Sequence, residues 1–170
     1  FAMSLEGTLM PSEARPDDAD APTPEKYPRL FSPREADLLV PYLDRMFGEI
    51  GTLRVALGAA LTGLEKYGIE LDKPLPEELA HEPEVTTVVD EALAAHKGLR
   101  DALIALEDLG VEVKALDGLV DVPSRFEGRI VFLCWKRGET RFAHWHETDQ
   151  GYAARIAIAN RRAFEGSLLH

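Results

Sequence analysis

Two long stretches of the chain repeat core-type residues at alternating spacings of four and three. In the first stretch these positions are Leu39, Leu43, Met46, Ile50, Leu53, Leu57, Ala60 and Leu64, and in the second they are Val85, Val89, Ala92, His96, Leu99, Leu103 and Leu106. This period places each set along one side of a helix. Two such stripes in succession predict a long antiparallel helix pair with a heptad seam.

The ends of both helices carry local signals. Ser32, Pro33 and Glu35 match a capping box with proline at the first helical position, so the first helix is expected to begin there. Pro41 lies inside the stripe and is expected to kink that helix. The second helix is expected to run from about residue 84 to 109, with Gly110 following its last turn.

The apolar period changes to two after the second helix. A short strand is expected at 118–123, a clear strand at 129–136 and a return strand at 140–146, with a two-residue turn at Arg137-Gly138. Residues 152–165 are expected to be helical. The predicted class is therefore α+β: a long antiparallel helix pair, a small antiparallel β-sheet made of a hairpin plus a short strand, and a C-terminal helix or tail.

The chain is expected to consist of one domain with an additional segment at each end. Residues 1–28 are expected to be an N-terminal extension, in which the two residues before Met3 are a cloning remnant and the rest is a tail rich in Pro, Asp and Ala. Residues 29–155 are expected to form a single α+β domain. Residues 156–170 are expected to form a C-terminal tail.

Composition excludes several classes of function. The chain has 19 Lys and Arg against 30 Asp and Glu, a formal net charge of −11. Such a charge is repelled by phosphate backbones and anionic lipid, so neither nucleic acid nor a membrane is an expected partner. The chain shows no apolar run of spanning length and no signal-peptide pattern. Its one cysteine, Cys134, cannot form a disulfide framework, and together these features predict a cytoplasmic protein.

The helical stripes are longer than the predicted sheet can cover. A helix pair of this length extends for roughly 40–50 Å, and three short strands cannot bury all of it. The uncovered length predicts a homodimer that buries the stripes about a two-fold axis.

The final third of the chain carries a recognisable series of short motifs. They are Gly-Leu-Val-Asp at 118–121, Cys134-Trp135, Gly138-Glu139, Trp145-His146-Glu147, Gly151-Tyr152 and Arg155, preceded by Phe31-Ser32-Pro33-Arg34-Glu35-Ala36 near the start. Over roughly residues 29–155 this series resembles the bacterial family DUF2203. His146 is typical of that pattern and His144 is not. The resemblance implies a shared pattern and no activity, so function is argued from the residues themselves.

Two histidines lie two residues apart on the predicted return strand. Side chains at this spacing point to the same face, so His144 and His146 are expected to lie close enough to chelate one metal ion, with zinc or iron as the fitting elements. Glu147 follows at the strand end and is expected to be a third ligand. The plainer alternative is that one histidine caps the sheet rim while the other faces solvent. In a further alternative, His146 and carboxylates form the site without His144.

Three further residues are expected to bind a small ligand beside this site. Asp121 ends the neighbouring short strand, Arg155 is a cation among several acids, and Trp145 is expected to line a pocket. The predicted register pairs Trp135 with Thr140, which places Cys134 on the opposite face from both histidines. Cys134 is therefore expected to be an inert buried thiol.

Glu139 is excluded from the predicted site because of its distance from His146 along the strand. Glu139 lies at the turn end of the hairpin, roughly 23 Å from His146 along a regular strand, and is therefore expected to lie outside the site.

Two hypotheses of different class remain open. In one, the hairpin end is a metal- or small-ligand-binding site. In the other, the chain is a structural or adaptor protein that dimerises through its heptad helices and has no catalytic activity. The sequence contains no GxGxxG, P-loop, HExxH or GxSxG motif, so no catalytic residue and no reaction are assigned.

Overall fold

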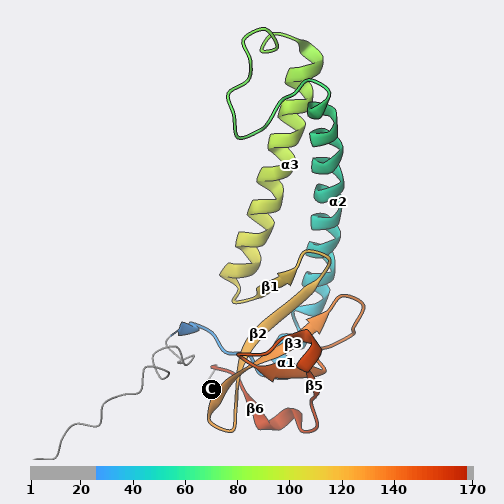
Figure 1. Ribbon diagram of the computed structural model, residues 1–170. Coiled ribbons are helices and arrows are strands. Elements are labelled where there is room, and N and C mark those ends of the chain that lie inside the picture. The colour runs from blue at the N-terminus through green and yellow to red at the C-terminus, as the bar shows by residue number, and fades with distance from the viewer. Residues whose placement is uncertain (1–25, 168–170) are drawn as a thin grey trace, which may run out of the picture.

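A computed structural model describes residues 26–167, which form a helical hairpin standing on a small antiparallel sheet (Figure 1). The helices are α1 (Pro33–Asp37), α2 (Val40–Glu65) and α3 (Pro83–Asp108), and the strands are β1 (Glu112–Ala115), β2 (Leu119–Phe126), β3 (Arg129–Lys136), β4 (His144–Glu147), β5 (Ile156–Ala157) and β6 (Phe164–Glu165). The predicted α+β class, with a helix pair before an antiparallel sheet, is confirmed. The tail predicted for residues 1–28 falls almost wholly outside the described residues.

The first predicted helix is two helices in the structure. α1 begins at the predicted capping box, where the Ser32 hydroxyl accepts a hydrogen bond from Glu35 N at 3.2 Å. It ends at Asp37, and α2 begins at Val40 with Pro41 in its first turn. A proline there costs no hydrogen bond, because the first N–H groups of a helix have no partner within it. The prediction that Pro41 kinks one continuous helix was therefore wrong.

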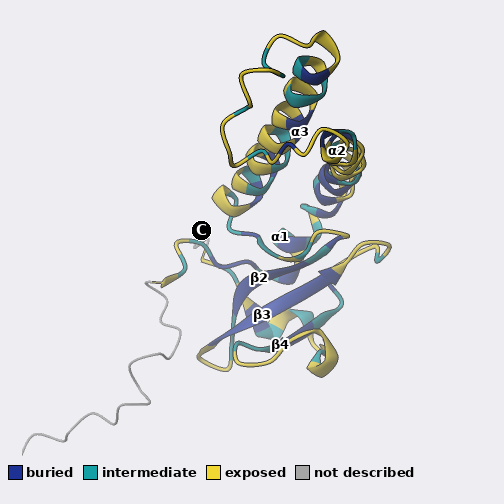
Figure 2. Ribbon diagram, turned by 45° about the horizontal axis from the view of Figure 1, so that its top comes forward, coloured by how far each residue is buried: buried dark blue, intermediate teal, exposed yellow. Residues whose placement is uncertain are grey.

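Most positions of the predicted stripes are buried or half-buried between the helices, but His96 is exposed, and Ala95 is buried in its place. Leu43, Ile50 and Leu64 on α2 and Val85, Ala92 and Leu106 on α3 are fully buried. Figure 2 shows the buried sides of α2 and α3 turned toward each other and toward the sheet, with exposed residues on their outer sides. α3 ends as predicted, with Gly110 in a left-handed conformation at φ 87°. None of the helices in the described part of the chain combines the length and the apolar character that a membrane crossing requires.

The sheet has the order β1-β2-β3-β4-β5, and β6 pairs with β2 beyond the end of β1. β2 continues through Pro123, where the sequence predicts that it ends. The Pro123 carbonyl accepts a hydrogen bond from Phe31 N at 2.7 Å, so this residue presents its backbone to the gap between β1 and β6 rather than to β3. The missing N–H of proline therefore breaks no bond of the β2–β3 ladder.

Residues 152–165 do not form the predicted helix. They form two single turns of 3-10 helix at Tyr152–Ala154 and Arg161–Ala163, separated and followed by the short strands β5 and β6. Phe164 packs face to face with Phe126 at a centroid distance of 4.5 Å, and the Ser167 hydroxyl accepts a hydrogen bond from Leu30 N. The chain beyond residue 155 therefore returns to the sheet and completes it.

The two faces of the sheet have different surroundings. Alternate residues of β2, β3 and β4, among them Val122, Leu133, Trp135 and Trp145, belong to the main hydrophobic core with α1 and the near ends of α2 and α3. The intervening residues point to the opposite face, because side chains alternate along a strand. That second face carries the candidate site.

Candidate functional site

Three neighbouring strands place one polar residue each at the same level of the second face. Asp121 on β2 is the cross-strand partner of Cys134 on β3, and Cys134 is the partner of His144 on β4. His146 follows two residues later on β4 and therefore points to the same side. Asp121, Cys134 and His146 are all buried, with at most 2% of their surfaces exposed. Burial of three such groups side by side requires that each be paired.

The ligand atoms of these three residues converge. The Asp121 carboxylate oxygen, the Cys134 sulfur and the His146 ring nitrogen all lie within 4.8 Å of one another. His146 Nε2 lies 3.0 Å from Asp121 Oδ2, and its Nδ1 lies 2.8 Å from the backbone carbonyl oxygen of Glu147. A backbone carbonyl only accepts, so Nδ1 carries a proton and Nε2 points into the cluster. This is the orientation that metal-binding histidines take when their second nitrogen donates to a carbonyl.

Burial and a neighbouring carboxylate keep the thiol protonated. Removal of Cys134 from water and the adjacent charge of Asp121 raise the pKa of the Cys134 thiol to about 12, and the cationic Arg155 opposes that rise only in part. A thiol with this pKa is a poor nucleophile at neutral pH. A metal cation reverses this balance, since a coordinated thiol is deprotonated outright.

One atom of the cluster is left without a partner. Asp121 Oδ1 is enclosed by protein and receives no hydrogen bond from any described residue. A buried carboxylate oxygen without a donor costs on the order of 1–3 kcal/mol. Asp121 therefore has capacity to bind something more than His146.

Arg155 and Glu139 close one side of the cluster. Arg155 Nη2 donates to Glu139 Oε1 at 2.6 Å, and Glu139 Oε2 accepts from Lys136 N at 3.0 Å. Burial raises the pKa of Glu139, but the hydrogen bonds from Arg155 and Lys136 and the nearby His144 outweigh burial and lower it below its ordinary value. Glu139 is therefore a charged partner that fixes Arg155. As predicted, Glu139 is not one of the clustered ligand residues, but it contacts the predicted site residue Arg155.

The hairpin register explains why Glu139 reaches Arg155 and why Cys134 joins the cluster. Arg137 and Gly138 do form the predicted turn, in which Glu139 N donates to Lys136 O at 3.0 Å and Gly138 has φ 103°. The chain then forms a loop instead of a strand, and β4 begins only at His144. The observed pairing of Cys134 with His144 is displaced by three residues from the predicted one. An odd displacement reverses the face of every side chain, so Cys134 lies with the histidines and not opposite them.

The structure brings some of the predicted site residues together and separates others. Asp121 and His146 meet as expected, and Arg155 lies beside them. His144 shares their face but lies outside the group whose ligand atoms are within 4.8 Å. Glu147 is not brought into the cluster: its carboxylate accepts from Arg129 Nε and Nη2 at 3.1 and 2.5 Å.

Neither Trp145 nor Cys134 has the role that the sequence predicts for it. Trp145 packs in the core against Phe126 and Phe164, at centroid distances of 4.9 and 5.8 Å, and lines no part of the cluster. Cys134 is the ligand-type residue that the sequence argument missed. Asp121 is its cross-strand partner on β2, and this pairing could have been found from the sequence once both strands were recognised.

Residues 29–158 match the family described as an uncharacterized conserved protein (DUF2203). No curated protein and no solved structure matches the chain. The matched segment contains every residue of the cluster.

Proposed function

The chain belongs to the DUF2203 family, whose description gives no activity, and from the buried cluster we propose that it binds a divalent transition metal, zinc or iron. Asp121, Cys134 and His146 are the proposed ligands. One observation carries the proposal: a carboxylate, a thiol and an imidazole lie within 4.8 Å of one another inside the protein. Zinc and iron both accept this mixture of oxygen, sulfur and nitrogen ligands.

The surroundings of the three ligands support this proposal. The Glu147 carbonyl orients the His146 ring, and one oxygen of Asp121 has no donor within residues 26–167. Three protein ligands leave one position of a tetrahedral site open, which is the arrangement of metal sites that bind a further ligand. In the metal-free state a proton lies between His146 Nε2 and Asp121 Oδ2, and the metal takes the place of that proton.

Metal content tests the proposal directly. The purified protein is dialysed against a weak chelator and then measured by elemental analysis, before and after incubation with zinc or ferrous iron. We expect about one equivalent in the wild type and loss of at least tenfold in affinity for H146A and C134A. E147A is the matched control, since Glu147 is a neighbouring acid that binds Arg129 and should leave metal content unchanged. A wild type that holds well under one equivalent after loading refutes the metal site.

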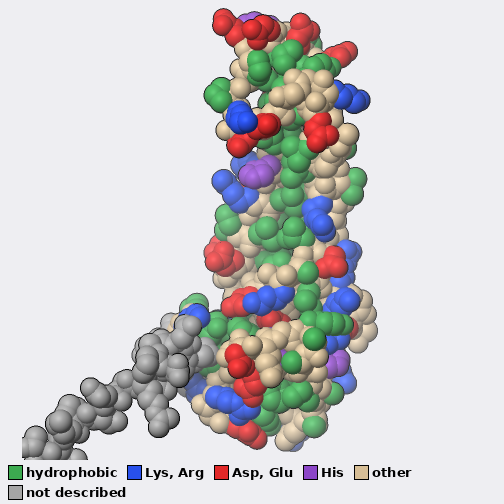
Figure 3. All heavy atoms as spheres, viewed as in Figure 1, with side chains coloured by type: hydrophobic (Ala, Val, Ile, Leu, Met, Phe, Trp, Pro, Cys, Tyr) green, Lys and Arg blue, Asp and Glu red, His purple; other side chains and the backbone are tan. Residues whose placement is uncertain are grey.

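A second candidate function rests on the helical hairpin. α2 and α3 are 26 residues each, about 39 Å, and only their near ends join the core of the sheet. Along their far half runs a shallow groove lined by Leu53, Ala56, Ala59, Ala60, Gly63, Val88, Glu91, Ala94 and Ala95, with a volume of about 520 Å³. Figure 3 shows hydrophobic side chains in a continuous stripe between the two helices, with charged side chains on both sides.

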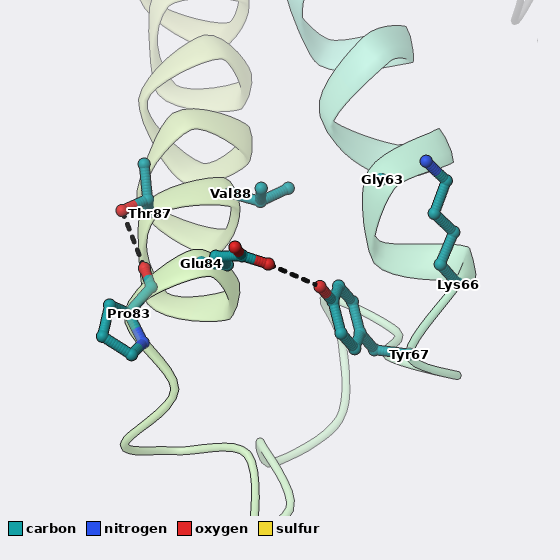
Figure 4. Close-up of a pocket in the computed structure, with 7 residues that line it drawn as sticks. All are labelled: Gly63, Lys66, Tyr67, Pro83, Glu84, Thr87 and Val88. Atoms are coloured by element: carbon teal, nitrogen blue, oxygen red, sulfur yellow. Dashed lines mark hydrogen bonds between the residues drawn. The ribbon is translucent and has the colours of Figure 1, made fainter.

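The groove continues to the far end of the hairpin. There a second hollow of about 500 Å³ is bordered by Tyr67, whose hydroxyl donates to Glu84 Oε2 at 3.4 Å, and by Gly63 and Val88, which it shares with the first (Figure 4). Small side chains let another helix approach closely. We propose that a second copy of this chain packs its hairpin here, which is the homodimer expected from the stripes.

Sedimentation equilibrium at micromolar concentration tests the dimer. We expect twice the chain mass of 18.8 kDa for the wild type and the single mass for A59E, which places a charge in the groove. T62E is the control, because Thr62 is an exposed residue of the same helix that does not border the groove. A monomeric wild type refutes the dimer and leaves the metal proposal untouched.

A further inference from the structure

The Arg155 guanidinium lies beside the proposed metal site. Its Nη2 donates to Glu139 Oε1 at 2.6 Å and to the Tyr152 hydroxyl at 3.4 Å, and the Tyr152 ring centroid lies 4.3 Å from Arg155 Cζ. Its Nη1 is enclosed by protein and meets no oxygen or nitrogen acceptor among the described residues, while the Cys134 sulfur, a weak acceptor, lies within reach of the guanidinium. A buried guanidinium N–H without an acceptor is costly, so this nitrogen marks a place for an acceptor that the chain does not supply.

The sheet places Arg155 next to the strand that carries His146. β5 pairs Ala157 with His144 and Ile156 with Trp145, so Arg155, the residue before β5, adjoins the next position of β4, which is His146. Its hydrogen bond with Glu139, which follows the turn after β3, brings the guanidinium toward Cys134. The cross-strand partner of Cys134 is His144, whose Nδ1 is also enclosed without a partner. Two unsatisfied nitrogens therefore flank the thiol that would bind the metal.

The open metal position and Arg155 Nη1 both call for an oxygen ligand at this place. A divalent ion bound by the Asp121 carboxylate and the Cys134 thiolate gives a site of zero net charge, and Glu139 balances Arg155, so the ligand is selected by its geometry and not by net charge. It has to coordinate the metal and accept a hydrogen bond from Arg155 Nη1 at once. A carboxylate does this with its two oxygens, in the planar geometry that a guanidinium recognises.

We propose that the open position of the metal takes a small carboxylate, with one oxygen on the metal and the other accepting a hydrogen bond from Arg155 Nη1. This inference rests on the proposed metal site. It names the class of ligand for that site: a small organic acid that binds through its carboxylate.

Cobalt-substituted protein separates this inference from the metal proposal. The protein is loaded with Co²⁺, the bound equivalents are counted, and the visible absorption of the Co²⁺ is followed while sodium acetate, and separately inorganic phosphate, is added. We expect acetate to shift the spectrum saturably. R155Q should keep the bound Co²⁺ and weaken acetate binding by at least tenfold, and R155K should weaken it less. K136Q is the matched control, because Lys136 is an exposed cation 5.2 Å from the same Tyr152 ring and its loss removes the same charge.

The outcomes are distinguishable. If no Co²⁺ binds, the metal proposal fails and this inference fails with it. If Co²⁺ binds and acetate leaves the spectrum unchanged, only the carboxylate inference is overturned. A response to phosphate without one to acetate overturns the assignment to carboxylates. Equal weakening by R155Q and K136Q overturns the role of Arg155 Nη1. If R155Q does not fold, the wild-type titration and R155K still decide the question.

Discussion

The proposed metal binding would release protons from this cluster, and their number can be counted. In the metal-free protein the Cys134 thiol is protonated, since burial and Asp121 raise its pKa to about 12. One further proton lies between Asp121 and His146, because His146 Nδ1 donates to a carbonyl while Nε2 faces a carboxylate oxygen. The metal-bound cluster holds a thiolate, a carboxylate and a neutral imidazole. One metal ion therefore displaces two protons.

The magnitude follows from that count. Where the metal-free protein holds both protons, the affinity for the metal should rise about 100-fold for each pH unit, which is about 2.7 kcal/mol of binding free energy. Titration calorimetry with zinc in two buffers of different ionisation enthalpy measures the proton count at a single pH, and repetition between about pH 6.5 and 8 measures the slope. C134A should reduce the count to one among the molecules that still bind.

The measured proton count can also refute the individual ligand and hydrogen-bond assignments. A count of one in the wild type and none in C134A would mean that no proton lies between Asp121 and His146, so the hydrogen-bond assignment of the imidazole would be wrong. A count of one that C134A leaves unchanged would mean that the sulfur is not a ligand. A count of zero would place the metal outside this cluster altogether.

Three further predictions concern stability. The raised pKa of the Cys134 thiol stabilises the metal-free protein fully below the ordinary thiol pKa of 9.0, and this stabilisation is lost as the pH rises toward 12. Between pH 9 and 12 the unfolding free energy, measured by urea titration, should therefore fall by up to ~4 kcal/mol more in the wild type than in C134A. G118A should lower the unfolding free energy by about 1–3 kcal/mol, because Gly118 has φ 114° and a Cβ there would meet a side-chain atom at 2.5 Å. G51A, in open space within a helix, should raise the unfolding free energy by about 0.5–1 kcal/mol, and thermal unfolding compares the two variants. D37A should cost about 1–3 kcal/mol, since the Asp37 carboxylate accepts from Phe142 N at 2.8 Å, and D37N, which keeps one acceptor oxygen, should cost less in the same assay.

The helices could be predicted because their signals are local. The spacing of Leu43, Ile50 and Leu64 defines one buried side of α2, and the capping box at Ser32 fixes the start of α1. The break at Leu38–Leu39 has no such signal, apart from Pro41. A proline inside an apolar stripe is compatible with a kink or with a new helix, and packing of the sheet against both segments decides between them.

The hairpin register could not be predicted because distant residues determine it. Phe142 is buried in the core, with its N–H bound to Asp37 in α1 and its carbonyl bound to Arg161 Nη1 near the end of the chain. Arg161 also forms an ion pair with Asp37. These contacts hold Thr140–Ala143 in a loop, and no pattern within the hairpin reveals them. The site residues Cys134 and Glu139 were misplaced for this reason alone.

The second face of the sheet is where the chain departs most from what packing alone favours. In the places of Asp121, Cys134 and His146, apolar residues of similar volume would fill the space without unsatisfied atoms. Among the described residues, Asp121 Oδ1 instead has no hydrogen-bond donor, and Arg155 Nη1 has no hydrogen-bond acceptor. A metal ion that carries a carboxylate satisfies both deficits together, whereas a hydrogen-bonded corner that serves only the fold leaves both unmet.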